Sequence, residues 1–115
     1  MDPTHVMSFA GAGGIVESIT LCGVEPGHVE QLSVHKGQLE IVYEHTHVDD
    51  ETGARISAGQ ALAMRSAMAG RAGMRIEFLE GGGLWSAGAP IVLSAWLAPG
   101  QLSKLQVVVT YRPDR

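Results

Sequence analysis

Cysteine is almost absent from this chain of 115 residues, because Cys22 is the only one. A single cysteine excludes an internal disulfide, and a chain of this length can bury a hydrophobic core without one. The chain also lacks the paired-cysteine motifs of thiol redox proteins and zinc ribbons. Cys22 ends a predicted strand, so we expect a buried structural thiol and not a nucleophile.

Charge is scarce as well, and basic charge most of all. Charged residues make up 17% of the chain and the formal net charge is -4, which gives no general attraction to phosphate or anionic lipid. We therefore expect neither a nucleic acid nor a membrane partner. No apolar run approaches the ~18 residues of a membrane helix. The start, Met1 to His5, lacks the basic segment of a signal peptide, so we expect a cytoplasmic protein, and the Ala- and Gly-rich composition favours a bacterial source.

Recognisable catalytic motifs are missing too. The glycine run that ends at Gly14 does not match a dinucleotide-binding fingerprint, because Val16 stands where the third glycine belongs. The residues that follow alternate like a strand and not like a helix. We interpret residues 1–14 as a flexible N-terminal arm and residues 15–115 as a single α+β domain.

Alternating apolar residues predict six strands. Three precede a helical segment and three follow it, and the first three are expected to form an antiparallel meander. The expected strands are Ile15 to Gly23, Val29 to Val34, Leu39 to Val48, Met74 to Glu80, Ile91 to Leu97 and Leu105 to Arg112. The run Val107 to Val109 is apolar on both faces, which predicts either a central position for the last strand or coverage of both its faces.

One helix is expected between the two groups of strands. Ser57 and Gln60 have the spacing of a capping box, residues 58–69 are rich in Ala, Met and Leu, and Gly70 is a typical terminator. Met64 and Met68 lie on the stripe that would face the sheet, where they can form an adaptable pocket wall or simply fill the core.

The predicted fold is therefore α+β, with a curved, mainly antiparallel sheet of about six strands and one helix in βββαβββ order. One short helix cannot cover six strands. The sequence leaves two solutions open: the sheet closes into a barrel-like shape around the helix, or a second copy of the chain covers the bare face and makes a homo-oligomer.

A hairpin with histidines at its open end is the main candidate site. A turn at Lys36 and Gly37 would pair Val34 with Leu39 and Leu32 with Ile41, and it would bring His28 opposite His45. His47 would share their face. Three imidazoles on one face, with Asp49 as an oxygen ligand, are a suitable ligand set for Zn or another divalent metal, or an acid–base cluster. The alternative is that these histidines form a solvated rim, so the sequence leaves the cofactor open.

A second candidate site is the glycine-rich loop that follows Gly81. It carries Trp85, and tryptophan in a loop is typical of recognition surfaces, although the same side chain can fold back over the core. Tyr43, on the histidine face of the hairpin, is a further candidate binding residue together with Met64 and Met68.

Two functions follow from these patterns. The first is a small acidic binding module, an accessory protein, inhibitor or small-ligand carrier, whose partner is a protein or a small molecule. The alternative is a small isomerase, cyclase or lyase that uses His28, His45 and His47, with or without a metal, as catalytic groups. The absence of a strong catalytic motif favours the binding module.

Overall fold

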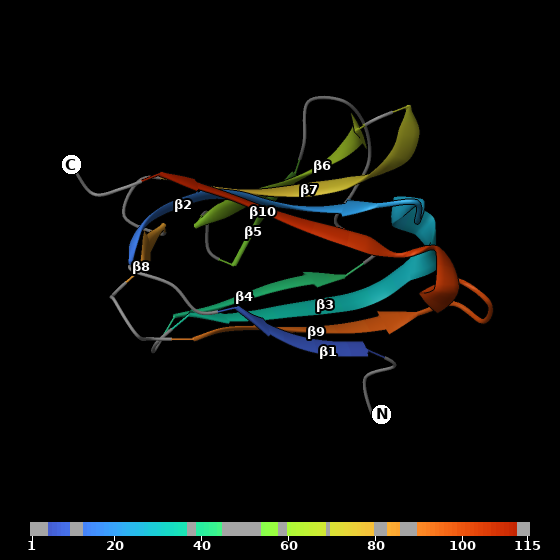
Figure 1. Ribbon diagram of the computed structural model, residues 1–115, viewed down its shortest axis with the longest axis horizontal. Helices are drawn as coiled ribbons and strands as arrows, with labels where there is room; N and C mark the ends of the chain where they lie inside the picture. Colours follow the sequence, from blue (N-terminus) through green and yellow to red (C-terminus); the bar gives the residue numbers. More distant parts are fainter. Residues whose placement is uncertain are drawn as a thin grey trace.

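The chain forms two antiparallel β-sheets that pack face to face, as the computed structural model shows (Figure 1). The structure describes residues 5–9, 13–36, 39–44, 54–57, 60–68, 70–79, 83–85 and 90–112. Sheet A contains, in spatial order, β1 (His5–Phe9), β9 (Ile91–Leu97), β3 (Val29–Lys36) and β4 (Leu39–Glu44). Sheet B contains β10 (Gln106–Arg112), β2 (Gly14–Cys22), β7 (Arg71–Phe78), β6 (Ala61–Met68) and β5 (Ala54–Ile56), and β8 (Leu84–Trp85) pairs with the start of β2. The described 3-10 turns are η1 (Pro26–His28) and η3 (Leu102–Lys104).

The hydrophobic core lies between the two sheets. β9 has the bounds that its alternation predicts, and it buries Ile91, Leu93 and Ala95 while Trp96 lies on the other face. Ile19 and Leu21 of β2 face the core from sheet B. Because each sheet has one face in the core, the alternation of apolar and polar residues along a strand indicates which of its side chains are buried.

The prediction of an α+β fold with one helix is wrong, because residues 61–68 form strand β6. Ala61 and Ala63 are fully buried, whereas Leu62 and Met64 between them are half-buried, which is the period of a strand. β6 pairs with β7 along its whole length, and this pairing outweighs the helix propensity of Ala, Leu and Met. Gly70 has a φ of +76°, so it is a turn residue of the β6–β7 hairpin. Within the described ranges, no helix is long and apolar enough to cross a membrane.

Ser57 does not cap a helix but joins the two sheets. Its φ is +50°, and its Oγ accepts a hydrogen bond from the Val42 backbone N–H at 2.6 Å and donates one to the Val42 carbonyl oxygen at 3.4 Å. Val42 belongs to the edge strand of sheet A, and Ser57 directly follows β5, the edge strand of sheet B. The Ser57 hydroxyl therefore makes the backbone hydrogen bonds of Val42 that a neighbouring strand would make, and it links the two sheets along one side of the sandwich.

The predicted single sheet, closed or open, is also wrong. β2 lies in sheet B while β3 and β4 lie in sheet A, so the expected three-strand meander is divided between the layers. Of the two alternatives for the last strand, the central position is wrong, because β10 is the edge strand of sheet B. Residues 5–9, inside the expected arm, form β1 and pair with β9.

The β3–β4 hairpin forms, but its register differs by two residues from the prediction. The observed pairs are Leu32 with Tyr43, Val34 with Ile41, and Lys36 with Leu39. Lys36 is thus the last strand residue and not part of the turn. Because the shift is even, Leu32, Val34, Ile41 and Tyr43 keep their predicted face, and all four are buried.

Candidate functional site

The predicted histidine site is only partly within the described residues. His28 is exposed at the end of η1 and does not lie on a strand. A bulge between Val29 and Gln31 turns Val29 into the core and leaves Glu30 exposed. His45, His47 and Asp49 lie outside the described residues. Among the residues that the structure does describe, no three His, Cys, Asp or Glu side chains gather as metal ligands, so the metal site stays a prediction.

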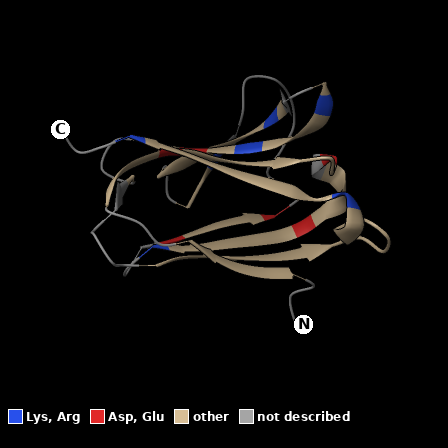
Figure 2. Ribbon diagram, in the orientation of Figure 1, with Lys and Arg blue, Asp and Glu red and all other residues tan. Residues whose placement is uncertain are grey.

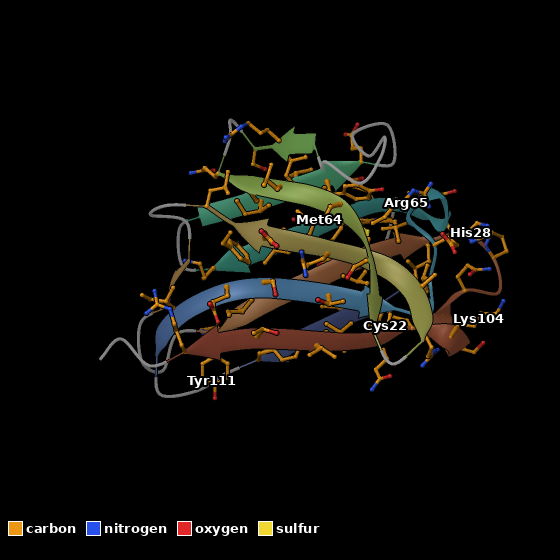
Figure 3. All side chains as sticks on the ribbon, turned by 90° about the horizontal axis from the view of Figure 1, so that it is seen from above. Cys22, His28, Met64, Arg65, Lys104 and Tyr111 are labelled. Atoms are coloured by element: carbon orange, nitrogen blue, oxygen red, sulfur yellow. The ribbon has the colours of Figure 1, made fainter. Side chains whose placement is uncertain are left out.

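Tyr43 and Met64, the other predicted site residues whose side chains the structure describes, do not lie together. Tyr43 is 0% exposed on the inner face of β4, and this burial raises the pKa of its phenol to about 12, against the opposing effect of the Arg65 charge. Met64 lies on the outer face of β6, where its Sδ accepts a hydrogen bond from Arg75 Nη2 at 3.2 Å. Figure 3 shows Met64 and His28 well apart. The side chains of Met68 and Trp85 lie outside the described part of the chain. Their binding roles stay predictions.

A cleft opens in sheet B where the sheet forks. β2 pairs with β7 from Ser18 to Cys22, but its first residues pair with β8 instead. β7 continues beside β6, and the Leu79 N–H donates to the Gln60 carbonyl at 2.9 Å. On the other side of β2, a bulge leaves Glu17 without a partner residue in β10. The cleft that results has a volume of about 650 Å³, and its described lining is Ile15, Val16, Glu17, Ser18, Glu77, Phe78, Leu79, Gly83, Thr110 and Arg112.

Gly83 fixes the width of the fork. Its carbonyl oxygen accepts a hydrogen bond from the Val16 N–H at 2.7 Å, so the chain before β8 lies directly against β2. A Cβ at this position would overlap the Val16 carbonyl oxygen. Only glycine lets the two backbones approach this closely, and the cleft depends on that approach.

The two carboxylates at the cleft, Glu17 and Glu77, can accept hydrogen bonds from a ligand. Glu77 pairs with Arg75 at 2.7 Å and Glu17 with Arg112 at 4.0 Å, and in both ion pairs the carboxylate uses Oε2. The Oε1 atoms therefore have lone pairs to offer a ligand. Figure 2 shows that both acidic and basic residues lie on sheet B, whereas the acidic residues of sheet A lie on β3 and β4.

The described lining of the cleft combines apolar surface with hydroxyl groups and contains neither histidine nor lysine. Ile15, Phe78 and Leu79 supply apolar surface, and Ser18 and Thr110 supply hydroxyl groups. A serine or threonine nucleophile needs a base such as histidine or lysine within hydrogen-bond reach. The described lining contains neither, and its hydroxyls can donate and accept hydrogen bonds with a ligand.

A second polar cluster lies on the outer face of sheet A. Glu40 Oε2 accepts a hydrogen bond from Ser33 Oγ at 3.2 Å and pairs with His35 Nε2 at 2.9 Å. The side chains of His35 and Glu40 are half-exposed. Because Ser33 donates to the carboxylate and not to the imidazole, the cluster lacks the nucleophile–base contact of a catalytic triad.

Comparisons of the chain with protein-family models, with curated proteins and with solved structures found no match. The cleft itself escaped the sequence analysis, because its residues come from separate segments of the chain. One signal points to it: β2 runs Ile15, Val16, Glu17, Ser18, Ile19, so two apolar residues and then two polar ones interrupt the alternation. Such an interruption is what a bulge produces.

Proposed function

We propose that this protein is a non-enzymatic binding module whose ligand occupies the fork of sheet B. The observation that carries the proposal is the combination of an apolar surface with two carboxylates that retain acceptor capacity. A volume of about 650 Å³ lies within the ordinary range of small-molecule and peptide-side-chain sites. Trp85 remains a candidate ligand contact, because its strand pairs with β2 at Gly14, next to the cleft.

The chemistry of the cleft selects the class of ligand. Glu17 and Glu77 each keep one oxygen outside their ion pair with an arginine, so a ligand that donates hydrogen bonds, such as a cation, is favoured over an anion. The apolar side chains Phe78 and Leu79 favour a hydrophobic group next to the cation. A peptide segment with an arginine or lysine beside a leucine-like residue meets both conditions.

The wider setting follows from the composition. With a net charge of -4 and a single cysteine, we propose a cytoplasmic protein that does not bind nucleic acid. We also propose that it self-associates.

The test is a titration followed by NMR, with N-acetyl-leucyl-arginine amide as the probe and the neutral citrulline analogue as its matched control. The arginine peptide should bind more tightly than the citrulline peptide, and added salt should reduce the difference. Glu17→Gln and Glu77→Gln should each weaken binding roughly twofold to fivefold, as expected for partly exposed ion pairs.

The control variant is Glu30→Gln, which removes an exposed carboxylate from sheet A. It should leave the affinity unchanged, because Glu30 does not line the cleft. Equal binding of both peptides, or equal losses in all three variants, would show that the cleft carboxylates do not select the ligand.

A further inference from the structure

The two sides of the sandwich differ in how their strand edges are protected. On one side, β4 and β5 are joined through the Ser57 hydroxyl and Val42. On the other side, β1 and β10 end their sheets, and within the described part of the chain each has a single strand neighbour. Figure 3 shows β10 along the side opposite β5. An edge strand exposes unpaired backbone N–H and C=O groups, which attract another strand unless the edge is short, charged or covered.

β10 has little of that protection. It is seven residues long, whereas β5 at the other edge of the same sheet has three. Arg112 is its only charged residue, and it contains no proline. Three large hydrophobic side chains are notably exposed among those described: Tyr111 at 52%, Val6 at 56% and Leu102 at 45%. Tyr111 lies on β10, Leu102 in η3 just before it, and Val6 on β1.

We propose that β10 pairs antiparallel with β10 of a second copy of this chain, so that the two B sheets become one continuous sheet. A two-fold axis through Val109 lets all seven residues pair, with Gln106 opposite Arg112, Val107 opposite Tyr111, and Val108 opposite Thr110. This contact is isologous and closes at two subunits. The inference gives a surface to the proposed self-association and does not depend on the ligand of the cleft.

The charges distinguish this register from its neighbours. A two-fold axis through Val108 would leave Tyr111 and Arg112 without a β10 partner, and it would bring Arg112 level with Lys104 of η3, where like charges repel. An axis through Thr110 would leave Gln106 and Val107 of β10 without a β10 partner. The register centred on Val109 uses the whole strand and opposes Arg112 to a neutral amide, so charge and length select the same pairing.

The test is the association of the full-length protein, measured by sedimentation velocity over a wide concentration range. Gln106 is exposed, it accepts a hydrogen bond from Arg71 Nη1 of its own chain at 3.3 Å, and in the proposed contact it occurs twice, each time opposite Arg112. Gln106→Glu should lower the dimer dissociation constant and Gln106→Lys should raise it, each by about tenfold, because two symmetric charge pairs change together. Circular dichroism of the monomeric fraction checks that each variant is folded.

The matched control is Ser8→Lys, an exposed position on β1, the edge strand of the other sheet on the same side. It should leave the dissociation constant unchanged. A dimer that is insensitive to both Gln106 variants but lost in Ser8→Lys would overturn the β10 contact while supporting self-association. A chain that stays monomeric at every concentration would overturn both.

Discussion

Tyr43 gives a sharp prediction about stability in alkali, because its phenol is buried between the sheets. The pKa of the folded protein's Tyr43 is raised from 10.0 to about 12, chiefly by burial. Between these two values the folded state holds a proton that the unfolded state has lost, so the free energy of unfolding falls as the pH rises. Each unit of pKa corresponds to about 1.4 kcal/mol, so the full loss between pH 10 and 12 is on the order of 3 kcal/mol.

The assay is urea unfolding of the wild type and Tyr43→Phe at several pH values from 8 to 12. Lys36 acts in the opposite direction, because burial lowers its pKa from 10.5 and its contribution to stability increases with pH up to that value. The difference between wild type and variant cancels this effect and any constant cost of the substitution. Tyr111→Phe, which changes the exposed second tyrosine, should retain the alkaline loss. Parallel curves for wild type and Tyr43→Phe would refute the reasoning.

Two further substitutions test the joints of the fold. Ser57→Ala should lower the free energy of unfolding by about 1 kcal/mol, because the Val42 amide loses its hydrogen-bond partner. Ser57→Gly should cost less, since glycine accepts the φ of +50°. Equal stability of wild type and Ser57→Ala in urea unfolding would contradict the role given to the hydroxyl. Gly83→Ala should lower the free energy of unfolding by about 1–3 kcal/mol and weaken binding of the arginine peptide, because the new methyl group forces β8 away from β2. Thermal unfolding checks the first effect and the NMR titration the second. Unchanged values would show that the close approach to Val16 is not required.

Strand β9 of sheet A could be read from the sequence because its residues alternate cleanly, whereas β1 of the same sheet lies inside the expected arm and was not predicted. In β9, buried Leu93 and Ala95 are separated by half-buried Ser94 and followed by Trp96, and the local pattern alone defines the element. The sequence of β6 resembles a helix, because Ala, Leu and Met are strong helix formers and Ser57 and Gly70 have the residue types of helix caps. The feature that indicates a strand is the two-residue spacing of the small buried residues Ala61 and Ala63. That spacing favours a strand only when β7 is present as a pairing partner.

The division into two sheets lies beyond any local pattern. Nothing in the sequence of β2 shows that its neighbours are β7 and β10 and not β3, since strand pairing is decided by contacts between distant segments. The same reason explains why Val107 to Val109 suggested a central strand. An edge strand with apolar residues on both faces has the same composition, and only the topology separates the two. The cleft combines residues of β2, β7 and β10, so it became visible only with the fold.

The most direct test of the proposed function is a map of amide shift changes when N-acetyl-leucyl-arginine amide is added to the wild-type protein. The largest changes should fall on Glu17, Ser18, Glu77 and Thr110, around the fork of sheet B. The outer face of sheet A, represented by Ser33 and His35, should stay unaffected. Changes confined to sheet A, or no change at saturating peptide, would contradict the assignment of the fork as the binding site.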